Sequence, residues 1–420
     1  MSQEKQIFLK AADFIGARLC RDAVWDGTRC NWLGDSMEFI GNTWAVVHRA
    51  FGPELYNGTS GIALFLARLF AETNERLYRV VAEGGVQQAL SRIEDISPPA
   101  RIGFYSGSTG VAYALIVLGE IFENQNFIEK ALQITQDLAQ DDIGEQGLDV
   151  ISGSAGAIPA LLTIYQKYRK DYLIDLAIQQ GECLLNTARR QEHGWSWNTL
   201  NMPGEQDLTG FSHGTAGIAW ALLELFQCTG QERFRDAAQQ GFRYERNLFN
   251  AEHENWPDFR SFYESTGPGA GTPAYAVAWC HGAPGIGLSR LRAYEISGEE
   301  SYRSEAEAAL RTTMKMLNQS AFMGQGNYSL CHGLAGNTEL VIYASQILRN
   351  ADYKVFADQI GRQGIEQYQK NYTPWPCGVN GGGETPNLML GLAGIGYFYL
   401  RLYDPVKNPS ILILSSKSQN

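Results

Sequence analysis

Runs of about a dozen apolar residues recur along the chain, and each run begins with a Gly-x-x-Gly step. These runs contain almost no charge, which predicts helices that are buried on nearly all sides. Seven copies of one pattern indicate a repeat architecture. The leading glycines are spaced by 46 to 68 residues and are Gly58, Gly107, Gly153, Gly214, Gly282, Gly333 and Gly391.

Charged, amphipathic stretches such as "EKQIFLKAADFIGARLC" and "ESYRSEAEAALRTTMKMLNQ" separate the copies. They predict helices with one solvated face. The alternation predicts an all-α fold, an α/α toroid with about seven inner and about seven outer helices and the glycine turns at one end of the inner layer. We expect one domain over residues 1–420, built from seven helix-pair repeats. Strand signals are sparse, so no strand is assigned a structural role.

Composition narrows the functional classes. A net charge of -11 and a pI near 5.2 argue against binding to nucleic acid or to an anionic membrane. The N-terminal residues lack the apolar core of a signal peptide, and no apolar run is long enough to span a bilayer. A cytoplasmic protein is expected, and its seven cysteines are expected to be thiols.

Histidine and cysteine occur at matching positions of three consecutive copies. His213, His281 and His332 each precede a leading glycine, and Cys280 and Cys331 precede the last two of these histidines. Equivalent repeat positions occupy equivalent places at the end of a ring, so Cys280 should approach Cys331 and His332. Two thiolates and one imidazole with an open fourth position suit a catalytic zinc site. The alternative is that the cysteines are small buried residues of helix-entry turns.

The segments "GFSHGTAG", "AWCHGAPG" and "SLCHGLAG" resemble the lanthionine synthetase C-like cyclases. "GPELYNGTSGIALFLA" and "TPNLMLGLAGIGYFYLRLYDP" are similar to the C-terminal cyclase domain of class II lanthipeptide synthetases. The resemblance covers nearly the whole chain and implies Zn²⁺ held by Cys280, Cys331 and His332. The dehydratase region of those synthetases is missing, so we expect a cyclase that acts on a dehydrated precursor peptide from a separate dehydratase.

The reaction implied by this resemblance is the addition of a peptide thiol to dehydroalanine or dehydrobutyrine. Zinc would keep the thiol deprotonated, and the enolate that forms needs a proton. His213 is the candidate acid, and the resemblance places an important aspartate at Asp149, which could orient His213. The alternatives are a structural histidine and a helix-capping aspartate. His281 is a weaker candidate for proton transfer. Several class I members of the family carry Tyr at this position and some carry Arg near Ala276, so the roles of those side chains do not transfer directly to this chain.

Other functions share some of these features. The same activated thiolate would serve a transferase that adds glutathione or another thiol to dehydrated side chains. A peptide-binding toroid with a purely structural metal would need a fourth ligand. A toroidal glycosidase would need two carboxylates at the cavity, whereas Asp149 alone lies near the glycine turns. Three tryptophans could line a peptide groove, although core packing is the commoner role, and they are Trp195, Trp197 and Trp279.

Overall fold

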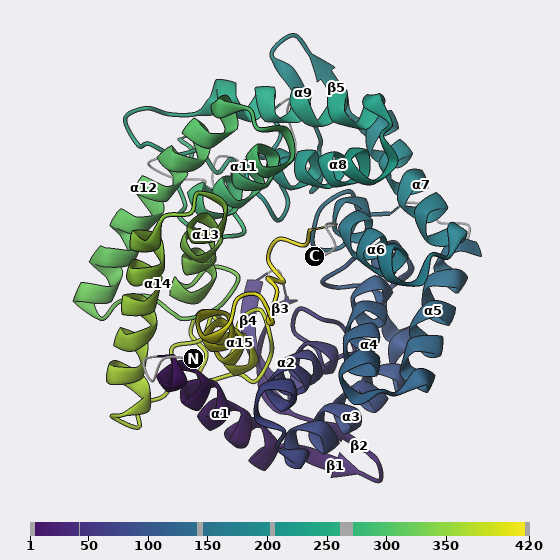
Figure 1. Ribbon diagram of the computed structural model, residues 1–420, viewed down its shortest axis with the longest axis vertical. Coiled ribbons are helices and arrows are strands. Elements are labelled where there is room, and N and C mark those ends of the chain that lie inside the picture. The colour runs from purple at the N-terminus through teal and green to yellow at the C-terminus, as the bar shows by residue number, and fades with distance from the viewer. Residues whose placement is uncertain (1–4, 42, 141–145, 202–205, 261–271, 416–420) are drawn as a thin grey trace.

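The computed structural model describes residues 5–41, 43–140, 146–201, 206–260 and 272–415. It is mainly helical, as predicted, and its long helices form two concentric layers (Figure 1). Each inner helix begins directly after the leading glycine of one copy. The inner helices are α2 (Thr59–Thr73), α4 (Ser108–Phe122), α6 (Ser154–Tyr168), α8 (Thr215–Thr229), α11 (Ala283–Ser297), α13 (Leu334–Ile347) and α15 (Leu392–Tyr403).

Each outer helix packs against an inner partner, and α15 packs against α2 to close the ring. Figure 1 shows the outer layer around the inner one. The outer helices are α1 (Gln6–Arg21), α3 (Arg76–Ser91), α5 (Gln125–Gln140), α7 (Asp171–Thr187), α9 (Glu232–Leu248), α12 (Glu300–Met323) and α14 (Ala351–Gly364). Short helical turns lie at η1 (Ile93–Asp95), η2 (Pro98–Ala100) and η3 (Ile365–Gln369). No described helix has the length and apolarity that a membrane span requires.

The second glycine of the repeated step permits a close backbone approach. A Cβ atom on Gly110 would lie 1.8 Å from the carbonyl oxygen of Phe104, and one on Gly336 would lie 1.7 Å from that of Leu330. These oxygens belong to the turn that precedes each inner helix, so a side chain would push the turn off the helix. The repeated glycine is therefore required by the packing of each turn on its own helix.

Backbone hydrogen bonds join the seven turns into a closed circle. The residues that take part lie mostly two positions before a leading glycine. The bonds run from Tyr56 N to Tyr105 O, Tyr105 N to Ile151 O, Val150 N to Ser212 O, Ser212 N to Cys280 O, Cys280 N to Cys331 O, Cys331 N to Met389 O and Met389 N to Tyr56 O, at 2.8 to 3.2 Å. Repeat-equivalent residues are therefore neighbours at one end of the ring.

Within the described residues, three antiparallel hairpins accompany the helices, although the sequence analysis assigned no structural role to strands. They are β1 (Val24–Asp26) with β2 (Arg29–Asn31), β3 (Leu33–Ile40) with β4 (Thr43–Ala50), and β5 (Arg189–Gln191) with β6 (Gly194–Ser196). Each is a two-stranded ribbon between or beside helices. The strands β1, β2, β5 and β6 have three residues each, which is too short for a recognisable alternating pattern. The strands β3 and β4 have eight residues each, and the sequence analysis missed them.

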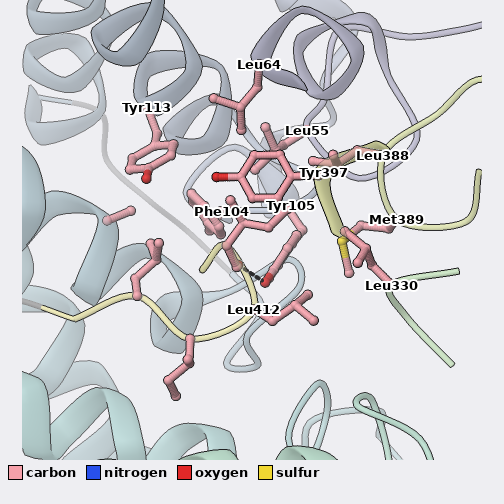
Figure 2. Packing of buried hydrophobic residues seen from close by; sticks show 14 of the residues in the cluster. Leu55, Leu64, Phe104, Tyr105, Tyr113, Leu330, Leu388, Met389, Tyr397 and Leu412 are labelled. Atoms are coloured by element: carbon pink, nitrogen blue, oxygen red, sulfur yellow. Dashed lines mark hydrogen bonds between the residues drawn. The ribbon is translucent and has the colours of Figure 1, made fainter. Parts of the chain in front are cut away.

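The C-terminal segment lies inside the ring. Residues 411–414 are buried, and Figure 1 shows the last described residues, in yellow, near the middle of the ring. The Tyr105 hydroxyl donates to Ile411 O at 2.6 Å, and Trp279 Nε1 donates to Leu412 O at 3.0 Å. Figure 2 shows Tyr105 and Leu412 in one apolar cluster with residues of several inner helices. The segment therefore helps to fill the centre of the ring.

The tryptophans considered for a peptide groove lie elsewhere. Trp197 and Trp279 are completely buried in the core. Trp195 is half-buried, and the Arg190 guanidinium lies 4.5 Å from the centroid of its ring. The groove interpretation is therefore wrong for Trp197 and Trp279. Burying their large apolar surfaces in the core stabilises the fold, and neither side chain is accessible to a peptide.

Candidate metal centre

Cys280, Cys331 and His332 meet at the end of the ring where the glycine turns lie. One ligand atom from each residue lies within 4.8 Å of the others. A tetrahedral zinc ion with two sulfur ligands and one nitrogen ligand would hold these atoms about 3.4 to 3.8 Å apart. The three side chains therefore need to close by only about 1 Å to hold zinc.

The surroundings of His332 select one of its ring nitrogens. Nε2 lies 2.9 Å from the carbonyl oxygen of Gly378. A carbonyl only accepts hydrogen bonds, so Nε2 carries the proton and Nδ1 keeps its lone pair for a metal. His332 is exposed and Cys331 is buried, so the cluster has one side toward solvent.

The two thiols influence each other. The hydrogen bond with Cys331 lowers the pKa of Cys280, and the nearby Arg260 charge acts in the same direction against the effect of burial. The same hydrogen bond and burial raise the pKa of Cys331. The pair therefore favours one shared proton without a metal, and a divalent cation would favour the loss of both protons.

His213 and Asp149 form a second group at this end of the ring. His213 Nδ1 lies 2.5 Å from Asp149 Oδ2. The other carboxylate oxygen, Oδ1, accepts from the backbone N–H of Ser152 at 2.7 Å. Asp149 is buried and does not cap α6, whose N-cap is Gly153 without a side-chain hydrogen bond. The carboxylate therefore orients the imidazole through Nδ1.

His281 lies between the two groups but is buried. Its ring centroid is 5.8 Å from that of His213, and its Nε2 is 3.4 Å from Ser212 Oγ. Its Nδ1 is 4.0 Å from Asp258 Oδ1. Burial, followed by the charge of Arg260, lowers the pKa of His281 to about 3. At neutral pH the imidazole is therefore uncharged and suited to hydrogen bonding.

Arg260 is a site residue that the sequence analysis missed. Its guanidinium pairs with Asp258, with Nη2 2.7 Å from Oδ2, and its charge acts on Cys280, His281 and His332. Arg260 follows "NWPDF" in the longest interval between copies, the 68 residues from Gly214 to Gly282. The extra length of this interval indicated that it contains residues beyond the helix-pair repeat, and this was the signal that could have pointed to Arg260.

Tyr56 was also missed. Burial raises its pKa well above the usual value, and contact with the Cys331 thiol acts in the same direction. Tyr56 precedes Gly58 by two residues, as Cys280 precedes Gly282 and Cys331 precedes Gly333. Alignment of the copies could have identified it, because the closed circle of backbone bonds places these positions side by side.

The model of the lanthionine synthetase C-like proteins matches residues 50–413, so the chain belongs to this family. This confirms the resemblance noted in the sequence. The chain is 22% identical over 402 residues to the lacticin 481/lactococcin biosynthesis protein LcnDR2 of Lactococcus lactis subsp. lactis, covering 91% of this chain and 39% of that protein. The chain thus spans about two fifths of that relative.

Two further relatives match over most of their length. Glutathione S-transferase LANCL1 of Danio rerio is 23% identical over 378 residues, covering 84% of this chain and 82% of that protein. The nisin biosynthesis protein NisC of Lactococcus lactis subsp. lactis is 24% identical over 342 residues, covering 75% of this chain and 79% of that protein.

Solved structures share the fold. Nisin cyclase superposes with a TM-score of 0.61 at 18% identity and covers 84% of this chain and 89% of its own. A family 105 glycoside hydrolase of C. acetobutylicum superposes with a TM-score of 0.51 at 12% identity, covering 74% of this chain and 95% of its own. The helical ring is therefore compatible with unrelated chemistries, and function has to be argued from the site.

Proposed function

We propose that this protein is a zinc-dependent cyclase that adds peptide cysteine thiols to dehydroalanine or dehydrobutyrine and thereby forms lanthionine or methyllanthionine rings. The observation that carries the proposal is the convergence of Cys280, Cys331 and His332 within 4.8 Å, in a member of the lanthionine synthetase C-like family. Bound zinc would supply a Lewis acid that keeps a substrate thiol deprotonated at neutral pH.

The residues of the chain account for the remaining chemistry. The substrate sulfur forms a bond to the β-carbon, the π electrons move to the neighbouring carbonyl, and the resulting enolate takes a proton at the α-carbon. His213 delivers this proton. Asp149 orients the His213 imidazole and stabilises its charged form. Arg260 offsets negative charge near the metal cluster. His281 is proposed as a hydrogen-bonding support for His213.

The net reaction joins two groups without losing an atom. The dehydro residues must therefore come from an earlier reaction that removes water from serine or threonine, and we propose a dehydratase as the partner that supplies the precursor peptide. A reducing cytoplasm suits this chemistry, because both the protein ligands and the substrate thiol must stay reduced. All seven cysteines are free in the structure.

The test combines metal content with ring closure. Elemental analysis should find about one zinc per chain, and a dehydrated peptide should lose its free thiol without a change in mass. Cys280→Ala and Cys331→Ala should lose both zinc and activity, whereas Cys183→Ala on α7 should keep both. Full zinc occupancy in the first two variants, or ring closure without zinc, would contradict the proposal.

A second candidate is the addition of glutathione to dehydrated side chains, which the name of the Danio rerio relative favours. The same cluster would activate the glutathione thiol. Mass spectrometry distinguishes the two when glutathione and a dehydrated peptide are supplied together. Addition of one glutathione per dehydro residue, with the peptide cysteine left free, would select this candidate over the cyclase.

A further inference from the structure

One face of the β3–β4 hairpin is apolar and exposed. The register pairs Phe39 with Trp44 and Met37 with Val46. Leu33 lies on the same face, beyond the Asp35–His48 pair. The exposed fractions are 56% for Leu33, 60% for Phe39, 65% for Trp44 and 39% for Val46. The opposite face contains Gly34 and Ser36, which are buried. We call the first face the hairpin apolar face.

The hairpin apolar face is attached to the loop that supports the metal centre. Asp35 lies on this face, and its Oδ2 accepts from the backbone N–H of Gly383 at 2.7 Å. The same loop contains Gly378, whose carbonyl accepts from His332. A Cβ on Gly381 would lie 3.9 Å from Val46 Cγ2.

These contacts limit the distance between the face and the site. The three residues from Gly378 to Gly381 span at most about 10 Å. The apolar face therefore begins within roughly 15 to 20 Å of the metal ligands, a reach of about five or six extended residues. Figure 1 shows β3 and β4 near the middle of the ring in projection.

The charge of the hairpin favours an apolar ligand. Asp35 pairs with His48 at 2.8 Å, and Glu38 pairs with Arg49 on the opposite face. The charged side chains of the described hairpin residues are thus matched with one another. A strongly charged partner would gain little from this surface, whereas an apolar segment would bury Phe39 and Trp44.

The size of the face argues against a second copy of the chain as its partner. The four exposed apolar side chains present roughly 500 Å², whereas each partner in a stable dimer buries about 800 Å². A patch of this size suits a short peptide segment that is also held elsewhere. The adjacent metal centre supplies that second attachment.

We infer that the hairpin apolar face binds an apolar segment of the peptide whose dehydro residue reacts at the metal centre. This inference rests on the proposed function for the identity of the peptide. The segment lies about five or six residues from the reacting residue, as the distance to the metal ligands requires. Binding there holds the substrate near the site and lowers its KM, while the rate of the chemical step is set by the site itself.

The test uses a double variant, Phe39→Thr with Trp44→Thr, which keeps the strand preference of the hairpin. Val355→Thr is the matched control, because it removes an apolar side chain that is 55% exposed on the outer helix α14. The first probe is a fluorescein-labelled peptide with one dehydroalanine, serine in place of cysteine, and a Leu-Val-Phe segment six residues away. Fluorescence anisotropy measures its Kd without any reaction.

The double variant should raise the Kd at least about 10-fold, and the control should leave it unchanged. With the cysteine-containing peptide, the double variant should raise KM while kcat and zinc content stay at the parent values. A peptide without the apolar segment should be cyclised equally well by both proteins. Equal Kd and KM for the double variant and the parent would overturn the inference.

Two further outcomes are distinguishable. A parent that cyclises both peptides with the same KM would overturn the hairpin inference and leave the proposed function intact. A parent that cyclises neither peptide would contradict the proposed function, and the anisotropy measurement would still test the hairpin. Analytical ultracentrifugation is the last control, because a parent dimer that the double variant converts to a monomer would assign the face to a second copy and overturn the inference.

Discussion

Replacing His213 with asparagine separates proton delivery from metal binding. His213 Nδ1 bonds to the buried Asp149 carboxylate at 2.5 Å, and an asparagine amide can donate a hydrogen bond to the same carboxylate. His213 is not one of the three clustered ligands, so zinc content should not change. The variant loses the ring nitrogen that would deliver a proton. Its fold should be retained.

The size of the effect follows from the role. General acid catalysis by a positioned side chain contributes about 10²–10⁴-fold to a rate, which corresponds to about 2.7 to 5.4 kcal/mol of activation free energy. We expect the His213→Asn variant to lose ring closure by this factor in single-turnover assays that follow the free thiol. The loss should appear in kcat, because the proton is transferred in the reaction and not in substrate binding.

The control is His193→Asn, which replaces an exposed histidine in the turn of the β5–β6 hairpin and should cyclise at the parent rate. Circular dichroism and elemental analysis should show parent helix content and zinc in both variants. A His213→Asn protein that closes rings at the parent rate would refute the assignment of the acid. A variant that loses zinc would instead show that His213 supports the metal centre.

Two other substitutions test the site and the fold. Arg260→Gln should lower kcat by about 10- to 100-fold, because a half-buried guanidinium near the cluster no longer offsets the developing charge, and an unchanged kcat with unchanged zinc would remove Arg260 from the mechanism. Gly336→Ala should lower the free energy of unfolding by at least about 2 kcal/mol in urea titrations, because its Cβ would lie 1.7 Å from Leu330 O. Gly383→Ala is the control, since its Cβ would meet its nearest atom at 3.7 Å, and equal stability of the two variants would contradict the packing argument.

Local repetition determined much of this protein. The apolar runs and leading glycines located the starts of the inner helices, because a buried helix needs a continuous apolar sequence and a tight turn needs glycine at fixed positions. The matching positions of Cys280, Cys331 and His332 indicated a shared site. Both conclusions depend on patterns that extend over a few residues and recur.

Only the tertiary structure determined which other residues lie near the metal cluster. The hydrogen bond from Met389 to Tyr56 joins the last turn to the first, and only this closure places Tyr56 beside Cys331. Arg260 reaches the cluster from an interval outside the repeat. The β3–β4 hairpin reaches the loop near His332 through Asp35, almost 350 residues away in sequence. Tyr56 and Cys331 share a repeat position, but the repeat alone does not bring the first copy next to the sixth. The contacts of Arg260 and Asp35 join residues with no shared periodicity, so their proximity follows from the packing of the whole ring.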